Sequence, residues 1–128
     1  MIVADVNIVV NLFLEGNHSE KAGALYENDP NWVLPDIWIH EMTNVLSTYV
    51  KHGGLDRSMS MELLNSSLDY FLPATVSLPM DGVLACSLDY NISAYDAEYI
   101  YLAREKNIPL ITVDKRLIRS IPDHTKSL

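Results

Sequence analysis

Four carboxylate side chains, those of Asp5, Glu41, Asp96 and Asp114, stand where a folded chain could bring them together. Asp5 and Asp114 each follow a short apolar segment that predicts a buried strand, and the carboxyl ends of parallel strands share one edge of a sheet. Asp96 lies in the first turn of a predicted helix, and Glu41 lies within the apolar face of another. Ligands of open α/β sheets bind beyond that edge, so we expect the four side chains to line one crevice.

The chemistry of such a crevice is that of a hard cation. Carboxylates held close together repel one another and raise one another's pKa values unless a cation lies between them. Oxygen ligands of this kind select Mg²⁺ or Mn²⁺. The four histidines and the one cysteine show no zinc-ligand spacing, and no glycine-rich phosphate loop is present. The sequence therefore predicts a site for a divalent cation.

Each carboxylate taken alone also has a structural explanation. Asp5 could cap the helix that follows it, and Asp96 could belong to the capping pattern at the start of its own helix. Glu41 could lie at the margin of its apolar face and extend to water, although a buried glutamate must be paired, protonated or metal-bound. The apolar face in question is formed at helical spacing by Ile37, Trp38, Val45, Leu46 and Tyr49.

The elements that position these side chains alternate between strands and helices along the whole chain. We expect strands at residues 1–4, 32–34, 74–78 and 109–113. We expect helices at residues 7–14, 18–28, 36–52, 56–71 and 79–91, a further helix between its cap Ser93 and its stop Asn107, and a short helix or turn at 115–121. The last residues have no pattern and are expected to fray. This alternation predicts one domain, residues 1–128, with a three-layer α/β/α fold and a central, mainly parallel sheet.

Composition places the chain in a class without disulfides or membrane spans. Its 128 residues are 48% hydrophobic, with no apolar run long enough to cross a bilayer. Cys86 is the only cysteine, so no intrachain disulfide can form and a reducing, cytoplasmic location is expected. The apolar start of the chain lacks the positive region of a signal peptide and carries Asp5.

Charge is distributed unevenly along the chain. The formal net charge is −8, which argues against a protein that coats nucleic acid generally. Residues 104–128 nevertheless carry +3, which leaves −11 for the remainder. This basic end could be a phosphate-contacting rim beside a cation site, or simply a solvated surface with uneven charge.

Three segments of the chain resemble a known family. They are VADVNIVVNLFL at the start, LPDIWIHEMTNVLSTYV in the middle and SAYDAEYIYLAREKNIPLITVDKRL near the end. Together they are similar to PIN domains, and most similar to the toxin ribonucleases of VapBC toxin–antitoxin modules. The resemblance implies that the four carboxylates hold Mg²⁺ or Mn²⁺ and that Asn7 and Thr112 are polar supports around them. One departure is Val6, where such proteins commonly have threonine between the aspartate and the asparagine.

The resemblance also implies an activity and partners. The expected reaction is metal-dependent endonucleolytic cleavage of RNA that leaves a 5′-phosphate and a 3′-hydroxyl. Lys115, Arg116 and Arg119 could contact the RNA backbone, or could simply complement the dipole of their own helix. A cognate antitoxin and a homodimer are the expected protein partners.

Three other functions remain open from the sequence. The chain could be a stand-alone RNA-processing PIN nuclease, or a PIN-like module that binds protein without catalysis. A phosphatase with a strand-end aspartate nucleophile is disfavoured, because Asn7 stands where such enzymes usually carry a second acid.

Overall fold

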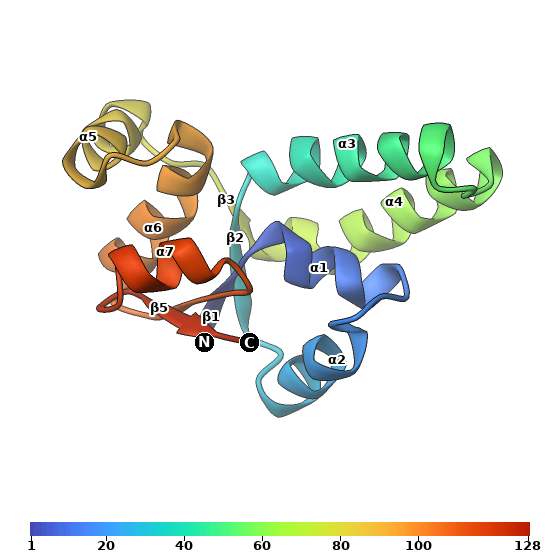
Figure 1. Ribbon diagram of the computed structural model, residues 1–128, viewed down its shortest axis with the longest axis horizontal. Helices are drawn as coiled ribbons and strands as arrows, with labels where there is room; N and C mark the ends of the chain where they lie inside the picture. Colours follow the sequence, from blue (N-terminus) through green and yellow to red (C-terminus); the bar gives the residue numbers. More distant parts are fainter.

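Five parallel strands form the centre of the protein in a computed structural model that describes all 128 residues (Figure 1). The order of the strands across the sheet is β3-β2-β1-β4-β5, and every neighbouring pair is parallel. The strands are β1 (Ile2–Ala4), β2 (Trp32–Pro35), β3 (Thr75–Val76), β4 (Leu110–Thr112) and β5 (Thr125–Ser127).

The central strands are apolar at every position because helices cover both faces of the sheet. All three residues of β1 and all three of β4 are buried. In the register of the sheet, Ala4 is paired with Ile111, and the amide of Asp5 donates to the carbonyl of Ile111. The end of β1 and the end of β4 therefore lie side by side, which brings the residues that follow them to one place.

The helices divide into two layers according to the direction in which the chain crosses the sheet. The connections from β1 through β2 to β3 run toward one edge, and those from β3 through β4 to β5 run toward the other. Right-handed crossovers therefore put α1 to α4 on one face and α5 to α7 on the opposite face, as Figure 1 shows. The helices are α1 (Val6–Phe13), α2 (Ser19–Asn28), α3 (Ile37–His52), α4 (Arg57–Phe71), α5 (Met80–Tyr90), α6 (Ala94–Lys106) and α7 (Lys115–Ser120), with a 3₁₀ turn at Leu72–Ala74. The expected three-layer α/β/α fold is confirmed.

Helix α6 is the central helix of its layer, packed on β1 and β2 on one side and on α5 on the other. Its predicted caps are both present. The hydroxyl of Ser93 accepts a hydrogen bond from the amide of Asp96 at 3.0 Å, and Asn107 ends the helix in the left-handed conformation with φ 53°. These caps fix which residue begins the helix, and so fix the height of Asp96 above the sheet.

The structure corrects the sequence-based assignment in three places. The chain end is not frayed, because Thr125–Ser127 forms the edge strand β5 against β4. The third strand is shorter than expected, with only Thr75 and Val76 paired. Pro79 is the N-cap of α5 rather than its first helical residue. A polar edge strand of three residues carries no alternation of apolar and polar residues, so its sequence gives no strand signal.

None of the seven helices has the length and apolar character needed to cross a bilayer.

Removal of residues 124–128 should destabilise the protein measurably. The carbonyl of His124 accepts a hydrogen bond from the amide of Leu110, and the amide of Leu128 donates one to the carbonyl of Thr112. The truncation removes both bonds and leaves the edge of β4 unpaired. With the buried Thr125 also lost, we expect a loss of ~2 kcal/mol and a melting temperature lower by roughly 7 °C. Thermal unfolding followed by circular dichroism measures this, with Lys126→Ala, an exposed site on the same strand, as control. An unchanged melting temperature would mean that β5 contributes nothing.

Candidate active site

The four sequence-predicted carboxylates come from four different elements that meet at the carboxyl-terminal edge of the sheet. Asp5 follows β1 directly, and Asp114 follows β4 with one residue between. Asp96 lies in the first turn of α6, and Glu41 lies in the second turn of α3, which begins directly beyond β2 (Figure 1). The edge between β1 and β4 is where the strand order reverses, the position at which open α/β sheets bind ligands.

A threonine hydroxyl connects the two strand-end aspartates. Thr112, fully buried at the end of β4, donates a hydrogen bond to Asp5 Oδ2 at 2.7 Å. The same hydroxyl accepts a hydrogen bond from the amide of Asp114 at 3.1 Å. Asp5 occupies the N-cap position of α1, yet its side chain forms no capping hydrogen bond there. The side-chain hydrogen bond that orients Asp5 thus comes from Thr112 on the neighbouring strand, and the backbone amides of Asn7 and Val6 act on Asp5 only by lowering its pKa.

Asp114 does cap its helix. Its Oδ1 accepts hydrogen bonds from the amides of Arg116 and Leu117 at 3.0 and 3.2 Å. These bonds hold the carboxylate over the start of α7 and leave Oδ2 without a hydrogen bond from the protein. A capping role and a ligand role are therefore compatible for this residue, one oxygen serving each.

Glu41 is held by a residue that the sequence reasoning missed. The hydroxyl of Tyr99, buried on α6, donates to Glu41 Oε1 at 2.7 Å. Glu41 itself is half-buried, beside the line of fully buried residues Trp38, Met42 and Leu46. The carboxylate is thus partnered rather than extended into water. Tyr99 lies three residues after Asp96, a helical spacing that puts both on one face of α6 and could have pointed to it.

The carboxylates influence one another electrostatically. Burial raises the pKa of Asp5, and the charge of Asp96 raises it further. Burial likewise raises the pKa of Asp96, with the charge of Asp114 adding to it. The pKa of Glu41 is raised to about 7, first by burial and then by the charges of Asp5, Asp96 and a further glutamate, Glu98, while the Tyr99 hydrogen bond opposes the shift. The four side chains therefore lie within one another's field.

No cation of the protein neutralises this field by direct pairing. The two ion pairs in the structure join the chain amino group to Asp29, and Arg104 to Glu105. Arg116, exposed on α7, lowers the pKa of Asp96 without forming an ion pair with it. The edge of the sheet is thus a concentration of negative charge that the chain leaves largely uncompensated.

The site fits a hard divalent cation by its donors, although the side chains do not already form a chelate. As they stand, no group of three or more acidic, histidine or cysteine side chains is arranged to hold a metal ion. Carboxylate oxygens are nevertheless the ligands that Mg²⁺ and Mn²⁺ select. Ligation would draw the free oxygens of Asp5, Asp96 and Asp114 toward one another, a movement that their mutual repulsion opposes in the metal-free protein.

Glu98 is a further acidic residue near the four carboxylates, and no pattern in the sequence singled it out. It is only 6% exposed, and its Oε1 has no hydrogen-bond partner. Burial raises its pKa, and the charge of Asp36 raises it further, whereas His40 lowers it. Glu98 is buried because α6 packs against the sheet on one side and against α5 on the other. This packing depends on the tertiary structure, so no local pattern in the sequence predicts the burial of Glu98.

The remaining predicted residues are exposed. The side chain of Asn7 forms no hydrogen bond within the protein and lies in a cleft between α1 and α3. Lys115, Arg116 and Arg119 all lie on the exposed side of α7, directly after Asp114. The support that Asn7 was expected to give to the carboxylates is thus without a hydrogen bond in this structure, whereas Thr112 makes its contact directly.

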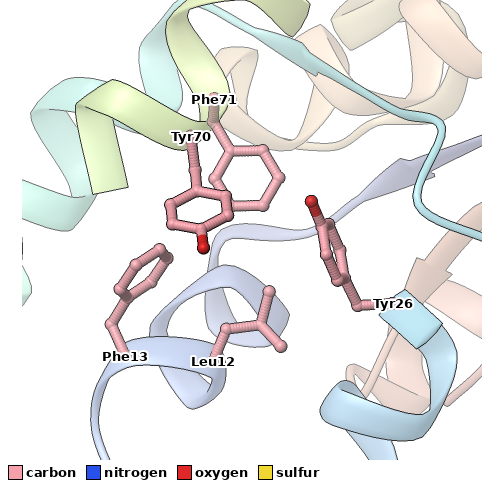
Figure 2. A pocket seen from close by; sticks show the side chains of 5 residues that line it. All are labelled: Leu12, Phe13, Tyr26, Tyr70 and Phe71. Carbon is pink, nitrogen blue, oxygen red and sulfur yellow. The ribbon is translucent and has the colours of Figure 1, made fainter. Parts of the chain in front are cut away.

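An apolar pocket lies elsewhere in the same layer of helices, at the far end of α1 from Asp5. It has a volume of about 210 Å³ and is lined by Leu12, Phe13, Tyr26, Tyr70 and Phe71. Figure 2 shows these side chains, contributed by α1, α2 and α4, directed toward one another around it. Phe13 and Tyr70 meet edge to face with ring centroids 6.0 Å apart. The pocket offers no acid, base or cation, so the chemistry of the protein belongs to the carboxylate edge.

The chain belongs to the PIN domain family, whose description matches residues 2–122. Among individual proteins it is similar to Ribonuclease VapC3 of Pyrobaculum aerophilum, with 23% identity over 124 residues that cover 94% of this chain and 95% of that one. A crystal structure of a Pyrobaculum aerophilum protein superposes with a TM-score of 0.76 at 20% identity, over 97% of this chain and 81% of that chain. A toxin–antitoxin complex from Klebsiella pneumoniae superposes with a TM-score of 0.70 at 20% identity, over 98% and 96%. The two solved structures establish a shared fold.

The raised pKa of Glu41 predicts how the stability of the metal-free protein depends on pH. Folded Glu41 keeps its proton to about pH 7, whereas the unfolded chain releases it near pH 4.3. Between these values the unfolded state binds fewer protons, so the free energy of unfolding falls as pH rises toward 7. Chemical denaturation in EDTA at about pH 5 and about pH 7.5 measures this change.

Glu41→Gln should flatten this dependence in its upper part, because the amide does not titrate. Asp5 and Asp96, whose pKa values are also raised, preserve a slope of the same sign at lower pH. The exposed Glu62, changed to Gln, is the control and should leave the profile of the wild type intact. Identical profiles for wild type and Glu41→Gln would show that Glu41 titrates normally.

Proposed function

We propose that this protein is a Mg²⁺- or Mn²⁺-dependent endoribonuclease, and that it acts as the toxin of a type II toxin–antitoxin pair, with residues 1–128 folding as one domain. The observation that carries the proposal is the set of four carboxylates at the point of strand reversal, without a lysine or arginine paired to any of them. The family to which the chain belongs, and the name of its relative Ribonuclease VapC3, support RNA as the substrate.

The carboxylates divide between ligation and water positioning. Asp5, Asp96 and Asp114 would hold one or two divalent ions through their free oxygens, and Glu41 would complete the set or orient the attacking water. A bound Mg²⁺ or Mn²⁺ lowers the pKa of a coordinated water and neutralises the charge that develops on the phosphate.

Two hydroxyl groups of the chain keep these carboxylates in place. Thr112 fixes the rotation of Asp5, and Tyr99 fixes that of Glu41. Both donors are buried, so water does not compete for the hydrogen bonds. The orientation of the two carboxylates is therefore set before substrate arrives, which lowers the reorganisation needed during reaction.

We propose that the basic residues of α7 contact the RNA backbone. Lys115, Arg116 and Arg119 are exposed and follow Asp114 on the β4 side of the crevice. Cations beside a carboxylate-bound metal ion would hold the phosphates of the RNA on one side of the scissile bond. Arg119 in the last turn of α7 also complements the helix dipole, and the two roles do not exclude each other.

An antitoxin is the expected protein partner. A similar fold occurs in a toxin–antitoxin complex from Klebsiella pneumoniae. We propose that a terminal segment of the antitoxin lies over the carboxylate edge and places an arginine against it as a bidentate pair. Such a contact would supply the positive charge that the chain itself does not provide.

A homodimer has an exposed apolar surface available to it on α5. Met80, Leu84 and Leu88 recur every four residues along this helix and are 56%, 57% and 71% exposed. Residues at this spacing form one continuous stripe on a helix. Burial of the stripe against a second copy would remove it from water, and we propose it as the dimer contact.

Loss of metal should abolish RNA cleavage, and loss of the Glu41 charge should slow it. In a mixed RNA pool, EDTA should stop cleavage and excess Mg²⁺ or Mn²⁺ should restore it. Glu41→Gln should lower the rate by on the order of a hundredfold or more, since acid–base and metal-site groups typically contribute that much. Glu62→Gln should cleave as the wild type does. Undiminished cleavage in EDTA would refute the metal mechanism, and absence of all cleavage with both ions would favour the non-catalytic binding module.

The dimer contact is tested by charge. Leu84→Glu together with Leu88→Glu puts two carboxylates into the proposed interface, so the protein should shift from dimer to monomer in sedimentation equilibrium. Both positions are exposed in the single subunit, so the substitutions should not unfold it. A cooperative thermal transition of the monomeric variant checks this. Leu72→Glu, which changes an exposed leucine outside α5, should leave the dimer intact. A monomeric wild type would refute the homodimer.

A further inference from the structure

A second cleft opens directly beside the carboxylate edge, between α1 and α3. Its volume is about 300 Å³, and its polar lining consists of Asn7, Asn11, Asn44, Thr48 and Tyr49, with two valines beneath them. Asn7 is two residues from Asp5, and Asn44 is three residues from Glu41, less than one turn of α3. The end of the cleft that Asn7 and Asn44 line is therefore the end nearer to the carboxylates.

Some of the polar groups in the cleft are committed to the protein itself. Asn11 donates from Nδ2 to the carbonyl of Asn7 at 2.6 Å and accepts from the amide of His18 at 3.3 Å. Thr48 donates its hydroxyl to the carbonyl of Asn44 at 3.0 Å. These two side chains are walls of the cleft, held in place by their hydrogen bonds.

The other three polar groups are free. The amides of Asn7 and Asn44 and the hydroxyl of Tyr49 form no hydrogen bond with the rest of the chain, and all three side chains are exposed. The ring of Tyr49 is 45% exposed. It lies against Gly53, where an added Cβ would come within 3.0 Å of Tyr49 Cδ1. An aromatic face and two primary amides are thus presented to the cleft on fixed helices.

The chemistry of this lining suits a nucleobase better than a phosphate. No lysine, arginine, aspartate or glutamate lines the cleft, so it offers hydrogen bonds without the positive charge that dominates affinity for phosphate. Primary amides form paired donor–acceptor contacts with base edges. Aromatic side chains stack on the faces of unpaired bases. The cleft therefore has the two kinds of group that recognise a base and lacks the cations that dominate binding to phosphate.

The cleft and the basic helix lie on opposite sides of the crevice. Helices α1 and α3 cover one face of the sheet, and α7 covers the other (Figure 1). A strand of RNA that crosses the edge of the sheet would meet the cations of α7 on one side and the cleft on the other. Phosphate contacts and a base contact are thus separated by the carboxylates themselves.

We propose that the cleft between α1 and α3 is a nucleobase subsite, in which the amides of Asn7 and Asn44 and the ring of Tyr49 hold an unpaired base beside the scissile phosphate. This inference rests on the proposed ribonuclease function and adds a source of substrate preference to it. A base must leave its stack and its pairing partner to enter the cleft, so the substrate is single-stranded RNA. The amides make the choice among bases, and the ring adds affinity for any base.

The subsite is tested by binding, independently of cleavage. The probe is a fluorescently labelled pool of single-stranded RNA in Mg²⁺, measured by anisotropy against Asp96→Asn protein, in which cleavage is blocked. In this background Tyr49→Ala should weaken binding by roughly fivefold or more, because stacking contributes on the order of 1–3 kcal/mol per base. Asn44→Ala should weaken it by a similar factor, because a paired amide contact with a base edge contributes about as much. Tyr49→Phe should keep nearly all of the affinity, since it retains the ring. Asn65→Ala, an exposed asparagine on α4, is the matched control and should bind as the parent does.

Cleavage supplies a second measurement. Sequencing of the product ends from wild type should show a nucleotide preference near the cut, and Asn44→Ala should relax it while Asn65→Ala preserves it. Fully paired RNA of the same sequence should be a poor substrate. Thermal unfolding confirms that the exposed-site variants remain folded.

The outcomes separate the subsite from the activity. Equal binding and equal cleavage profiles for wild type, Asn44→Ala and Tyr49→Ala would overturn the subsite while the ribonuclease stands. If the wild type cleaves no RNA but both variants bind RNA more weakly than the parent does, the ribonuclease proposal is overturned and the subsite stands. Failure of the parent protein to bind single-stranded RNA at all would overturn the subsite.

Discussion

Parallel pairing of β1 with β4 is the constraint on which the rest of this structure depends. The two strands are neighbours in the sheet, yet the connections that follow them run toward opposite edges. One crossover helix therefore cannot cover the carboxyl ends of both strands. That leaves a crevice with Asp5 on one side and Asp114 on the other. The buried hydroxyl of Thr112 bridges it, bonding to the carboxylate of the first and to the backbone of the second. Every other feature of the site is added to this pair.

The electrostatic design of the edge is unfavourable for the metal-free fold. Asp5, Glu41 and Asp96 all have raised pKa values, with burial as the first cause and neighbouring carboxylates among the others. A fold selected for stability alone would replace some of these groups by neutral ones, because like charges in a partly buried site destabilise it. Buried Glu98 adds to the same field from α6. A cation bound at this edge, as proposed, would offset the repulsion.

Different chemistries occupy different surfaces of this small protein. The carboxylates lie at the sheet edge, the basic residues follow on α7, neutral amides line the cleft between α1 and α3, and aromatic rings close a pocket between α1, α2 and α4 (Figure 2). Helix α1 contributes to two of these surfaces within eight residues, and Asp5 of the carboxylate edge precedes it directly. This is possible because a helix presents a different face every residue, while its buried residues anchor it to the sheet.

The amino-acid sequence by itself determined the class of fold and the positions of the four carboxylates. Apolar strands, the Ser93 and Asn107 caps and the alternation of elements are local patterns, and local patterns can be read along a chain. Glu41 stood out because a charge within an apolar helix face is locally inconsistent. Tertiary structure alone decided which groups partner them: Tyr99 meets Glu41 across 58 positions of sequence, and Thr112 meets Asp5 across 107. It also exposed Tyr49, whose spacing had placed it with the buried residues of α3, and it ordered Thr125–Ser127 into a strand. A hydrogen bond between distant elements and a strand recruited by an open edge depend on where the sheet puts them, and no local pattern carries that information.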